Sequence, residues 1–283
     1  MTPELCALTN FTFLTGASHP EEMARRAAEL GLSHIAVTDV NSVAGVVRAH
    51  VALRDLKREG AATIRQGDNV GYEDVRERAL ALAKRNRDPK DDSADLRAAK
   101  AAAREGSDVH TIDGPTKPEA PALEAEAPIL SLPQLIPGAR LRLADGWEIT
   151  ALPTDRPAWG RLTRLLTLGK RRASKGGCIL HLKDVEAWRE GMRLILHPPC
   201  PLGAGGEMDG CARLLKRLAA GGAAALALAP RYDGRDRERF TSLAKVAREA
   251  GAPLAATSAP IMHRARRRQL ADVLTCVREG TTI

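Results

Sequence analysis

Short apolar runs alternate with helical segments at the start of the chain, and this alternation constrains the fold more than any other feature. Glu4–Leu8 and His34–Thr38 have the length and composition of buried strands. Helical patterns at His19–Leu30 and Ser42–Lys57 follow them. A β-α-β-α order predicts parallel strands joined by helical crossovers, as in α/β proteins.

The first of these helices carries signals at both ends. Ser18 is the expected N-cap, because a serine hydroxyl accepts a hydrogen bond from the free amides of a first helical turn. Pro20 suits that first turn, since it has no amide hydrogen to leave unpaired. Gly31 is expected to end the helix.

The second half of the chain repeats the alternation. Ala139–Leu143 and Trp147–Leu152 flank Asp145 and Gly146, a strong two-residue hairpin signal. With the later strands this gives about seven in all, which predicts an α/β barrel rather than an open sheet. The later strands are expected at Met192–Leu196, Ala223–Leu228 and Pro253–Ala256, with helices at Ala158–Leu168, Cys211–Ala220 and Arg235–Ala250 and a basic loop at Gly169–Gly177.

A stretch of different composition interrupts the pattern. Residues 65–133 are rich in alanine, proline and charge, and 113–128 read DGPTKPEAPALEAEAP. Such a composition buries little apolar surface and is typical of linkers. We therefore expect one barrel made of residues 1–64 and 134–283, separated by a long, partly disordered insertion at 65–133.

Composition narrows the classes of function. The formal net charge of +8 favours an acidic partner such as nucleic acid, although a GC-rich genome that favours arginine explains it equally well. Only eight residues are aromatic (three Trp, two Tyr and three Phe), so the core must be built mostly from Ala, Leu and Val. Five cysteines without a C-x-x-C pair argue against a disulfide framework and fit a reducing cytoplasm. No signal peptide or long apolar run is present, so we expect no membrane partner.

Five segments, taken in order, resemble the start of bacterial C-family DNA polymerases, whose first domain is the PHP (polymerase and histidinol phosphatase) domain. Glu4–Met23 (ELCALTNFTFLTGASHPEEM) is similar to the family's E-L-H-x-H opening, and Ile35–His50 to its strand with T-D-H. Leu135–Gly146 resembles the family's G-C-E strand. Pro153–Gly176 and Gln269–Ile283 resemble the error-prone branch in particular.

This resemblance implies a distorted (β/α)7 barrel of PHP type. In family members that keep the ligands, a metal cluster at the strand ends supports phosphoester hydrolysis or proofreading exonuclease activity. The ligands are replaced here when they are carried over one position at a time. The two histidines of the opening fall on Cys6 and Leu8, the Asp of its L-D-G segment on Thr15, the histidine of T-D-H on Val40 and the Glu of G-C-E on Arg140.

The remaining ligand positions follow the same trend. The late N-D-x-H motif falls on Ser258, Ala259, Pro260 and Ile261, and the family's cysteine falls on or beside Cys200. We therefore expect no metal, no cofactor and no catalytic residue. Asp39 is kept, and Arg140 is expected to pair with it if the two strand ends face each other.

Two further groups have both a functional and a structural interpretation. His197 with Cys200 provides too few ligands for a zinc site, so a rigid turn is the favoured interpretation. The two basic clusters, 170–175 and 263–268, are candidates for DNA contact, with solvated helix ends and loops as the alternative. No aromatic residues interleave them, so no stacking platform is expected. The candidate DNA-contacting residues are Lys170, Arg171, Arg172, Arg266, Arg267 and Arg268.

The leading hypothesis is therefore a non-catalytic, structural PHP domain of an error-prone DNA polymerase that acts in damage-tolerant synthesis. Its partners would be the remainder of the polymerase chain and possibly DNA, in the cytoplasm. The alternatives are a metal-dependent PHP phosphoesterase or exonuclease and a decayed, truncated reading frame. Bound metal would favour the enzyme, and a stop codon after Ile283 would favour either alternative.

Overall fold

The computed structural model describes residues 2–66, 132–199 and 206–283. The chain divides into two units, Met1–Arg58 with Ala127–Ile283 and Glu59–Glu126. The first unit is the one described below. The expected insertion at 65–133 lies outside the described residues except at its two ends, and Cys200 lies outside them too.

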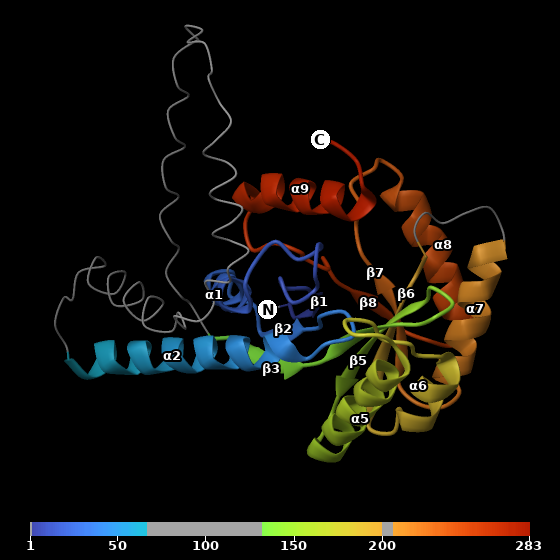
Figure 1. Ribbon diagram of the computed structural model, residues 1–283, viewed down its shortest axis with the longest axis horizontal. Helices are drawn as coiled ribbons and strands as arrows, with labels where there is room; N and C mark the ends of the chain where they lie inside the picture. The colour runs from blue at the N-terminus through green and yellow to red at the C-terminus, as the bar shows by residue number, and fades with distance from the viewer. Residues whose placement is uncertain (1, 67–131, 200–205) are drawn as a thin grey trace, which may run out of the picture. The chain divides into compact units, whose positions relative to one another are not determined.

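The first part of the chain forms a small parallel sheet. β1 (Glu4–Ala7), β2 (His34–Val37) and β3 (Gln134–Pro137) are hydrogen-bonded in that order, and both pairs run parallel (Figure 1). α1 (Pro20–Glu29) connects β1 to β2, and α2 (Ala44–Gln66) follows β2. The predicted β-α-β-α opening is confirmed, and the expected helix at 42–57 begins two residues later and continues to Gln66.

The second part forms a five-stranded mixed sheet. β4 (Ala139–Arg142), β5 (Glu148–Pro153), β6 (Met192–His197), β7 (Ala224–Leu228) and β8 (Leu254–Ala256) lie in sequence order. The β4–β5 and β5–β6 pairs are antiparallel, and the last two pairs are parallel. The hairpin predicted between β4 and β5 is confirmed, because the two strands pair antiparallel. Its turn places Gly146 at a φ of 90°, which glycine adopts readily.

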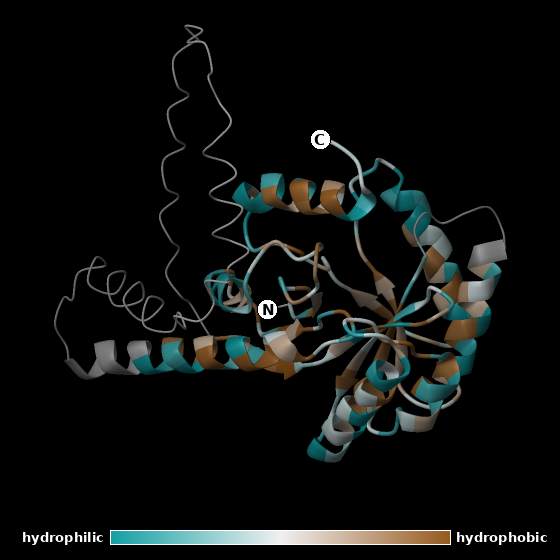
Figure 2. Cartoon of the chain, viewed as in Figure 1, coloured by the Kyte–Doolittle hydropathy of each residue, from teal (hydrophilic) through white to brown (hydrophobic). Residues whose placement is uncertain are grey.

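Helices cover this sheet with their apolar sides. Leu162, Leu215 and Leu243 are fully buried against the strands. Hydrophobic residues lie on the strands and on the facing sides of the helices, with polar residues outside (Figure 2). The core is built mostly from Ala, Leu and Val, as the composition predicts. The helices of this part are α5 (Arg156–Arg172), α6 (Leu182–Trp188), α7 (Gly206–Ala219), α8 (Asp236–Glu249) and α9 (Arg268–Glu279), with a 3-10 turn, η1 (Ala265–Arg267), before α9.

The two sheets share a narrow interior, in which one residue from each of six strands packs together. These residues are Cys6, Ala36, Leu152, Ile195, Ala227 and Ala255. Most of these side chains are small, so the sheets can approach closely. The interior therefore joins both sheets into one body.

The α/β prediction is confirmed, but no closed sheet is present among the described strands. At one seam, β2 and β4 meet through an isolated parallel bridge between Val40 and Arg140. At the other, the Leu8 amide donates to the Pro260 carbonyl at 2.9 Å, beyond the ends of β1 and β8. The barrel expected from strand alternation is therefore not closed by continuous ladders.

Local assignments also need correction. Ser18 is not the N-cap of α1; His19 is, and its amide donates to the Glu22 carboxylate at 2.9 Å. The Ser18 hydroxyl instead accepts from the His263 amide at 2.9 Å. The predicted basic loop at 169–177 is helical as far as Arg172, where cations suit the negative end of the helix dipole.

None of the helices in the described ranges is both long and apolar enough to cross a bilayer.

Candidate functional site at the strand ends

The loops that follow β1, β2 and β8 meet at one end of the molecule, and residues 8–18, 38–43 and 257–263 are called the mouth below. The amide of Ala17 donates to the carbonyl of Ile261 at 2.7 Å, which joins the first loop to the last. Leu14, Asn41 and Ala259 have φ values of 55°, 51° and 43°, a region that non-glycine residues rarely adopt. The mouth therefore holds a strained backbone even though its expected metal ligands are replaced.

Asp39, the retained acidic residue, is fully engaged by its neighbours. Its Oδ1 accepts from the Thr9 amide at 2.7 Å and from the Thr12 hydroxyl at 2.8 Å. Its Oδ2 accepts from the Thr9 hydroxyl at 2.8 Å. Burial raises the pKa of the Asp39 carboxyl, and these hydrogen bonds oppose that shift. Asp39 thus fastens the β1 loop to the end of β2.

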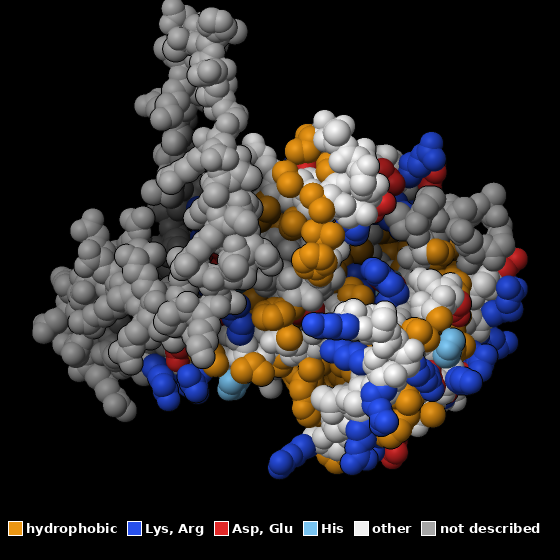
Figure 3. Space-filling model, viewed as in Figure 1, with side chains coloured by type: hydrophobic (Ala, Val, Ile, Leu, Met, Phe, Trp, Pro, Cys, Tyr) orange, Lys and Arg blue, Asp and Glu red, His pale blue; other side chains and the backbone are white. Residues whose placement is uncertain are grey.

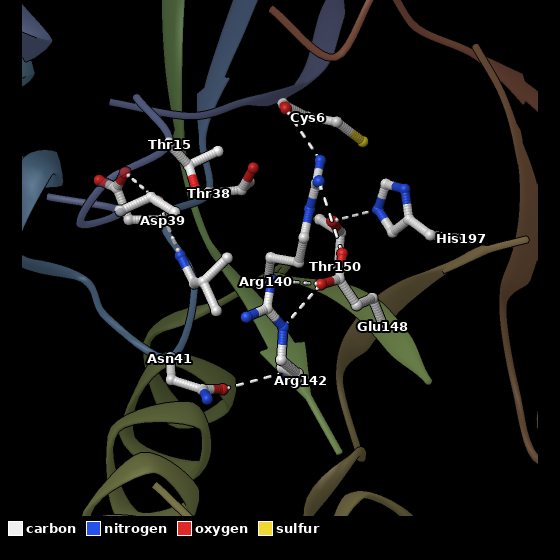
Figure 4. A network of polar contacts seen from close by, with 12 residues as sticks. Cys6, Thr15, Thr38, Asp39, Asn41, Arg140, Arg142, Glu148, Thr150 and His197 are labelled. Carbon is white, nitrogen blue, oxygen red and sulfur yellow. Dashed lines mark hydrogen bonds and ion pairs between the residues drawn. The ribbon is translucent and has the colours of Figure 1, made fainter. Parts of the chain in front are cut away.

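Arg140 lies beside the shared interior, and its side chain is 10% exposed. It points from β4 toward Cys6 (Figure 4), where one Nη donates to the Cys6 carbonyl at 3.2 Å. Its other Nη lies 3.7 Å from an oxygen of Glu148. The expected ion pair with Asp39 is wrong: only the backbones meet, through the Arg140 amide and the Asp39 carbonyl at 3.1 Å.

Cys6 and His197 are buried close to the Arg140 guanidinium. Burial raises the pKa of the Cys6 thiol, and the nearby Arg140 charge opposes this effect. Burial lowers the pKa of His197 well below its usual value, and Arg140 lowers it further. The His197 ring shares a 2.8 Å hydrogen bond with the Thr150 hydroxyl (Figure 4). This interior therefore keeps one fixed cation beside a neutral thiol and a neutral imidazole.

Sequence reasoning missed Glu4, which joins the two sheets at the second seam. Its carboxylate accepts from the Cys6 amide at 2.8 Å, from the Ser258 amide at 2.9 Å and from the hydroxyls of Ser258 and Thr257. Glu4 is buried at 7% exposure. The sequence did carry a signal for this role, because Glu4 is a charged residue at the start of an otherwise apolar strand.

These residues do not fit a metal cluster. Arg140 and Val40 face each other across the first seam, and Leu8 lies next to Pro260 at the second. Neither an aliphatic side chain nor a guanidinium is a metal ligand, and Asp39 already accepts hydrogen bonds at both carboxylate oxygens. Within the described ranges, no three His, Cys, Asp or Glu residues are grouped as a metal site requires.

Comparison with known proteins places the chain among PHP-containing polymerases. A PHP domain family model matches residues 6–111. The error-prone DNA polymerase of Ruegeria pomeroyi is 45% identical to the chain over 289 residues, covering 99% of this chain. The chain carries a PHP domain and matches the N-terminal region of error-prone DNA polymerases.

The chain spans about a fifth of the length of these relatives. It spans 22% of the Ruegeria polymerase and 19% of the error-prone polymerase of Rhodopseudomonas palustris, to which it is 34% identical. A crystal structure from Bifidobacterium adolescentis, described as a candidate metal-dependent phosphoesterase, superposes with a TM-score of 0.50 at 10% identity. That superposition covers 93% of this chain and 88% of the other protein, and it supports the mixed α/β fold alone.

A cavity of about 590 Å³ opens at the mouth, and we call it the mouth cavity. Thr15 and Val40, at two positions where the family resemblance implies metal ligands, line it. Figure 3 shows Lys and Arg side chains gathered on this face below α9, with hydrophobic side chains beside them. The lining residues are Phe11, Thr12, Phe13, Thr15, Val40, Asn41, Ser42, Arg142, Lys170, Ala173, Ser174, Lys175, Gly176, Gly177, Cys178 and Arg278.

The predicted DNA-contacting residues separate into different environments. Lys170 lines the mouth cavity. Arg172 is bound by Asp184 at 2.5 Å, and Arg267 by Glu22 at 2.5 Å. Arg268 lies 3.8 Å from Asp272. Carboxylates therefore offset part of both basic clusters, and the first cluster contributes Lys170 and Lys175 to the mouth cavity. Arg171 and Arg266 are exposed.

Proposed function

We propose that this chain is the N-terminal PHP domain of an error-prone DNA polymerase and acts there as a structural, non-catalytic domain. The 45% identity to the Ruegeria polymerase over nearly the whole chain supports the first part. Because the chain spans about a fifth of that relative, nucleotidyl transfer is assigned to the remainder of the longer polymerase. That remainder is accordingly the main partner.

The observation that carries the structural role is the position of Arg140. The family resemblance puts a Glu ligand there, whereas this chain puts a buried cation that holds the Cys6 carbonyl and Glu148. A cation at that position repels metal ions in a poorly screened interior, where charges interact more strongly than in water. The former ligand position therefore stabilises the packing of the two sheets.

Metal analysis and a hydrolysis assay test this proposal directly. The whole chain, purified without chelators, is expected to retain no stoichiometric zinc, manganese or iron. It is also expected to release no nucleotides from a single-stranded or primer-template substrate. Retained metal together with exonuclease activity that a chelator abolishes would favour the metal-dependent phosphoesterase alternative instead.

Three finer proposals go with this function. We infer that the two sheets form a distorted barrel, because residues from six strands share one interior. We also propose damage-tolerant, translesion synthesis as the process, because the matched relatives are named error-prone polymerases. The cytoplasm is the proposed compartment, since bacterial DNA synthesis takes place there. We also propose that the two basic clusters, at residues 170–175 and 263–268, contact DNA.

A further inference from the structure

The mouth cavity combines two features that lie far apart in the sequence. Lys170 and Lys175 come from the end of α5 and the loop after it, whereas Phe11 and Phe13 come from the loop after β1. None of the described residues that line this cavity is Asp or Glu. The cavity is therefore cationic and carries aromatic side chains at the same place.

The positively charged side chains of the cavity differ in whether a carboxylate pairs with them. Arg142 is held by Glu148 at 2.8 Å, and Arg278 by Glu279 at 2.9 Å. Lys170 and Lys175 are exposed, and no carboxylate within the described ranges lies within ion-pair distance of either. These two lysines thus supply positive charge that is available to an anion.

Both phenylalanines that line the mouth cavity are exposed to solvent. Phe13 is 82% exposed, and Phe11 is 36% exposed with the Arg48 guanidinium 5.9 Å from its ring centre. The strained Leu14 follows Phe13, and its carbonyl accepts from Arg278. Phe13 and Phe11 line the same cavity as Lys170 and Lys175, so the exposed ring of Phe13 is available to a ligand that the lysines attract.

We propose that the mouth cavity binds single-stranded nucleic acid, with Lys170 and Lys175 on its phosphates and bases stacked on Phe13. This site rests on the proposed function in an enzyme of DNA synthesis, and it adds a binding surface that needs no metal. Backbone cations beside aromatic rings are the combination that single strands require. A cavity of about 590 Å³ lies within the range of roughly 300–1000 Å³ typical of ligand sites.

Other anions explain the cavity less well. Free phosphate needs the lysines but leaves the exposed ring of Phe13 without a role. Duplex DNA offers phosphates, but its bases are stacked on one another and cannot cover a phenylalanine. The single strand is therefore the occupant that uses both features.

Fluorescence anisotropy with a short labelled oligo-dT, over a series of salt concentrations, tests the site in the whole 283-residue chain. K170E/K175E is expected to weaken binding at least tenfold and to reduce the slope of log K against log salt by about 1.4, from roughly 0.7 for each phosphate that a lysine no longer neutralises. Phe13→Ala is expected to weaken binding roughly 5- to 100-fold because its ring no longer stacks on a base. Circular dichroism establishes that each variant is folded.

Matched controls separate this site from a general effect of charge. R213E/K216E makes the same charge change on α7, away from the cavity, and Tyr232→Ala removes a side chain that is 86% exposed elsewhere. Both are expected to bind within about twofold of wild type. The site would be overturned if the control and cavity variants lost affinity equally, or if Phe13→Ala bound as tightly as wild type. It would also be overturned if the wild-type chain did not bind the oligonucleotide. None of these outcomes alters the test for bound metal and hydrolysis, so failure of the site is distinguishable from failure of the proposed function.

Discussion

At the scale of single residues, Arg140 joins β4 to β1 and to Glu148 from the position where the family resemblance implies a Glu ligand. The variant Arg140→Glu puts a second carboxylate beside Glu148. It also removes the donor to the Cys6 carbonyl and places another acceptor there instead. Because the Arg140 side chain is only 10% exposed, the new carboxylate would be a buried charge beside a like charge, and the change is expected to lower the free energy of unfolding by roughly 3–5 kcal/mol. Urea unfolding monitored by circular dichroism measures it.

Arg142→Glu is the matched control, because Arg142 pairs with the same Glu148 from a side chain that is 57% exposed. Exposed pairs contribute roughly 0–1 kcal/mol, so this variant is expected to unfold close to wild type. Equal stability of the two variants, or recovery of Arg140→Glu on adding zinc or manganese, would contradict the structural role of Arg140.

His197 makes stability depend on pH. Its folded pKa lies well below 6.5 because of burial and Arg140, so the unfolded chain binds a proton that the folded chain does not. Stability is therefore full above about pH 6.5 and falls as the pH decreases toward the folded pKa, by up to about 1.4 kcal/mol per pH unit. Urea midpoints between about pH 5 and 7.5 should show a shallower decline for His197→Gln. A steeper decline in that variant would contradict the assignment.

At the scale of elements, the first turn of α2 lies against the Asp39 network. A Cβ on Gly45 would come within 2.4 Å of the Asp39 Oδ2 and 3.0 Å of the Thr9 hydroxyl. Gly45→Ala is therefore expected to destabilise the fold by about 1–3 kcal/mol. Gly160→Ala in α5 is the control, since a Cβ there meets no atom within 4 Å. Alanine should stabilise that helix by about 0.5–1 kcal/mol, and thermal unfolding of both variants checks the opposite signs.

The elements that the sequence predicted well are those that local signals specify. The Asp145-Gly146 turn predicts the β4–β5 hairpin because two residues determine it. β3 was missed because it is only four residues long and ends at Pro137, directly before Gly138, so that pairing with β2 is what makes it a strand. Ser18 has the chemistry of an N-cap, but a tertiary contact with His263 takes its hydroxyl. In both cases a partner distant in the sequence, β2 for β3 and His263 for Ser18, determines the local structure.

The same limit applies to the candidate site. The resemblance implies a replaced ligand at each position, and this stays a prediction. The side chain that Arg140 pairs with depends on the β4–β5 register, which places Arg142 opposite Glu148. The absence of aromatic residues near the lysines in the sequence predicted no stacking surface. The fold brings Phe13 to Lys170 and Lys175 from a loop more than a hundred residues earlier. Proximity in space, unlike a motif, cannot be read from sequence order.

At the scale of the whole molecule, the two sheets are joined by a shared interior and two seams rather than by ladders. Glu4 gathers donors from the β8 loop at one seam, and Arg140 meets Val40 at the other. β2 and β3 pair in register although residues 38–133 separate them in the sequence. Met1–Arg58 and Ala127–Ile283 accordingly form one compact unit.

Limited proteolysis tests that organisation. The composition of residues 65–133 cannot bury enough apolar surface to offset about 1–2 kcal/mol of backbone entropy per residue, so the first cuts are expected there. The two fragments should nevertheless remain together, because the β2–β3 pairing, the Cys6–Arg140 hydrogen bond and the Glu4–Ser258 hydrogen bonds all join one fragment to the other. Mass spectrometry locates the cuts, and size-exclusion chromatography shows whether the fragments co-elute. Glu4→Gln weakens the acceptor at the second seam, so its nicked form should separate at a lower urea concentration than nicked wild type. Protection of residues 65–133, or separation of the wild-type fragments without denaturant, would show that the seams do not hold the two halves as proposed.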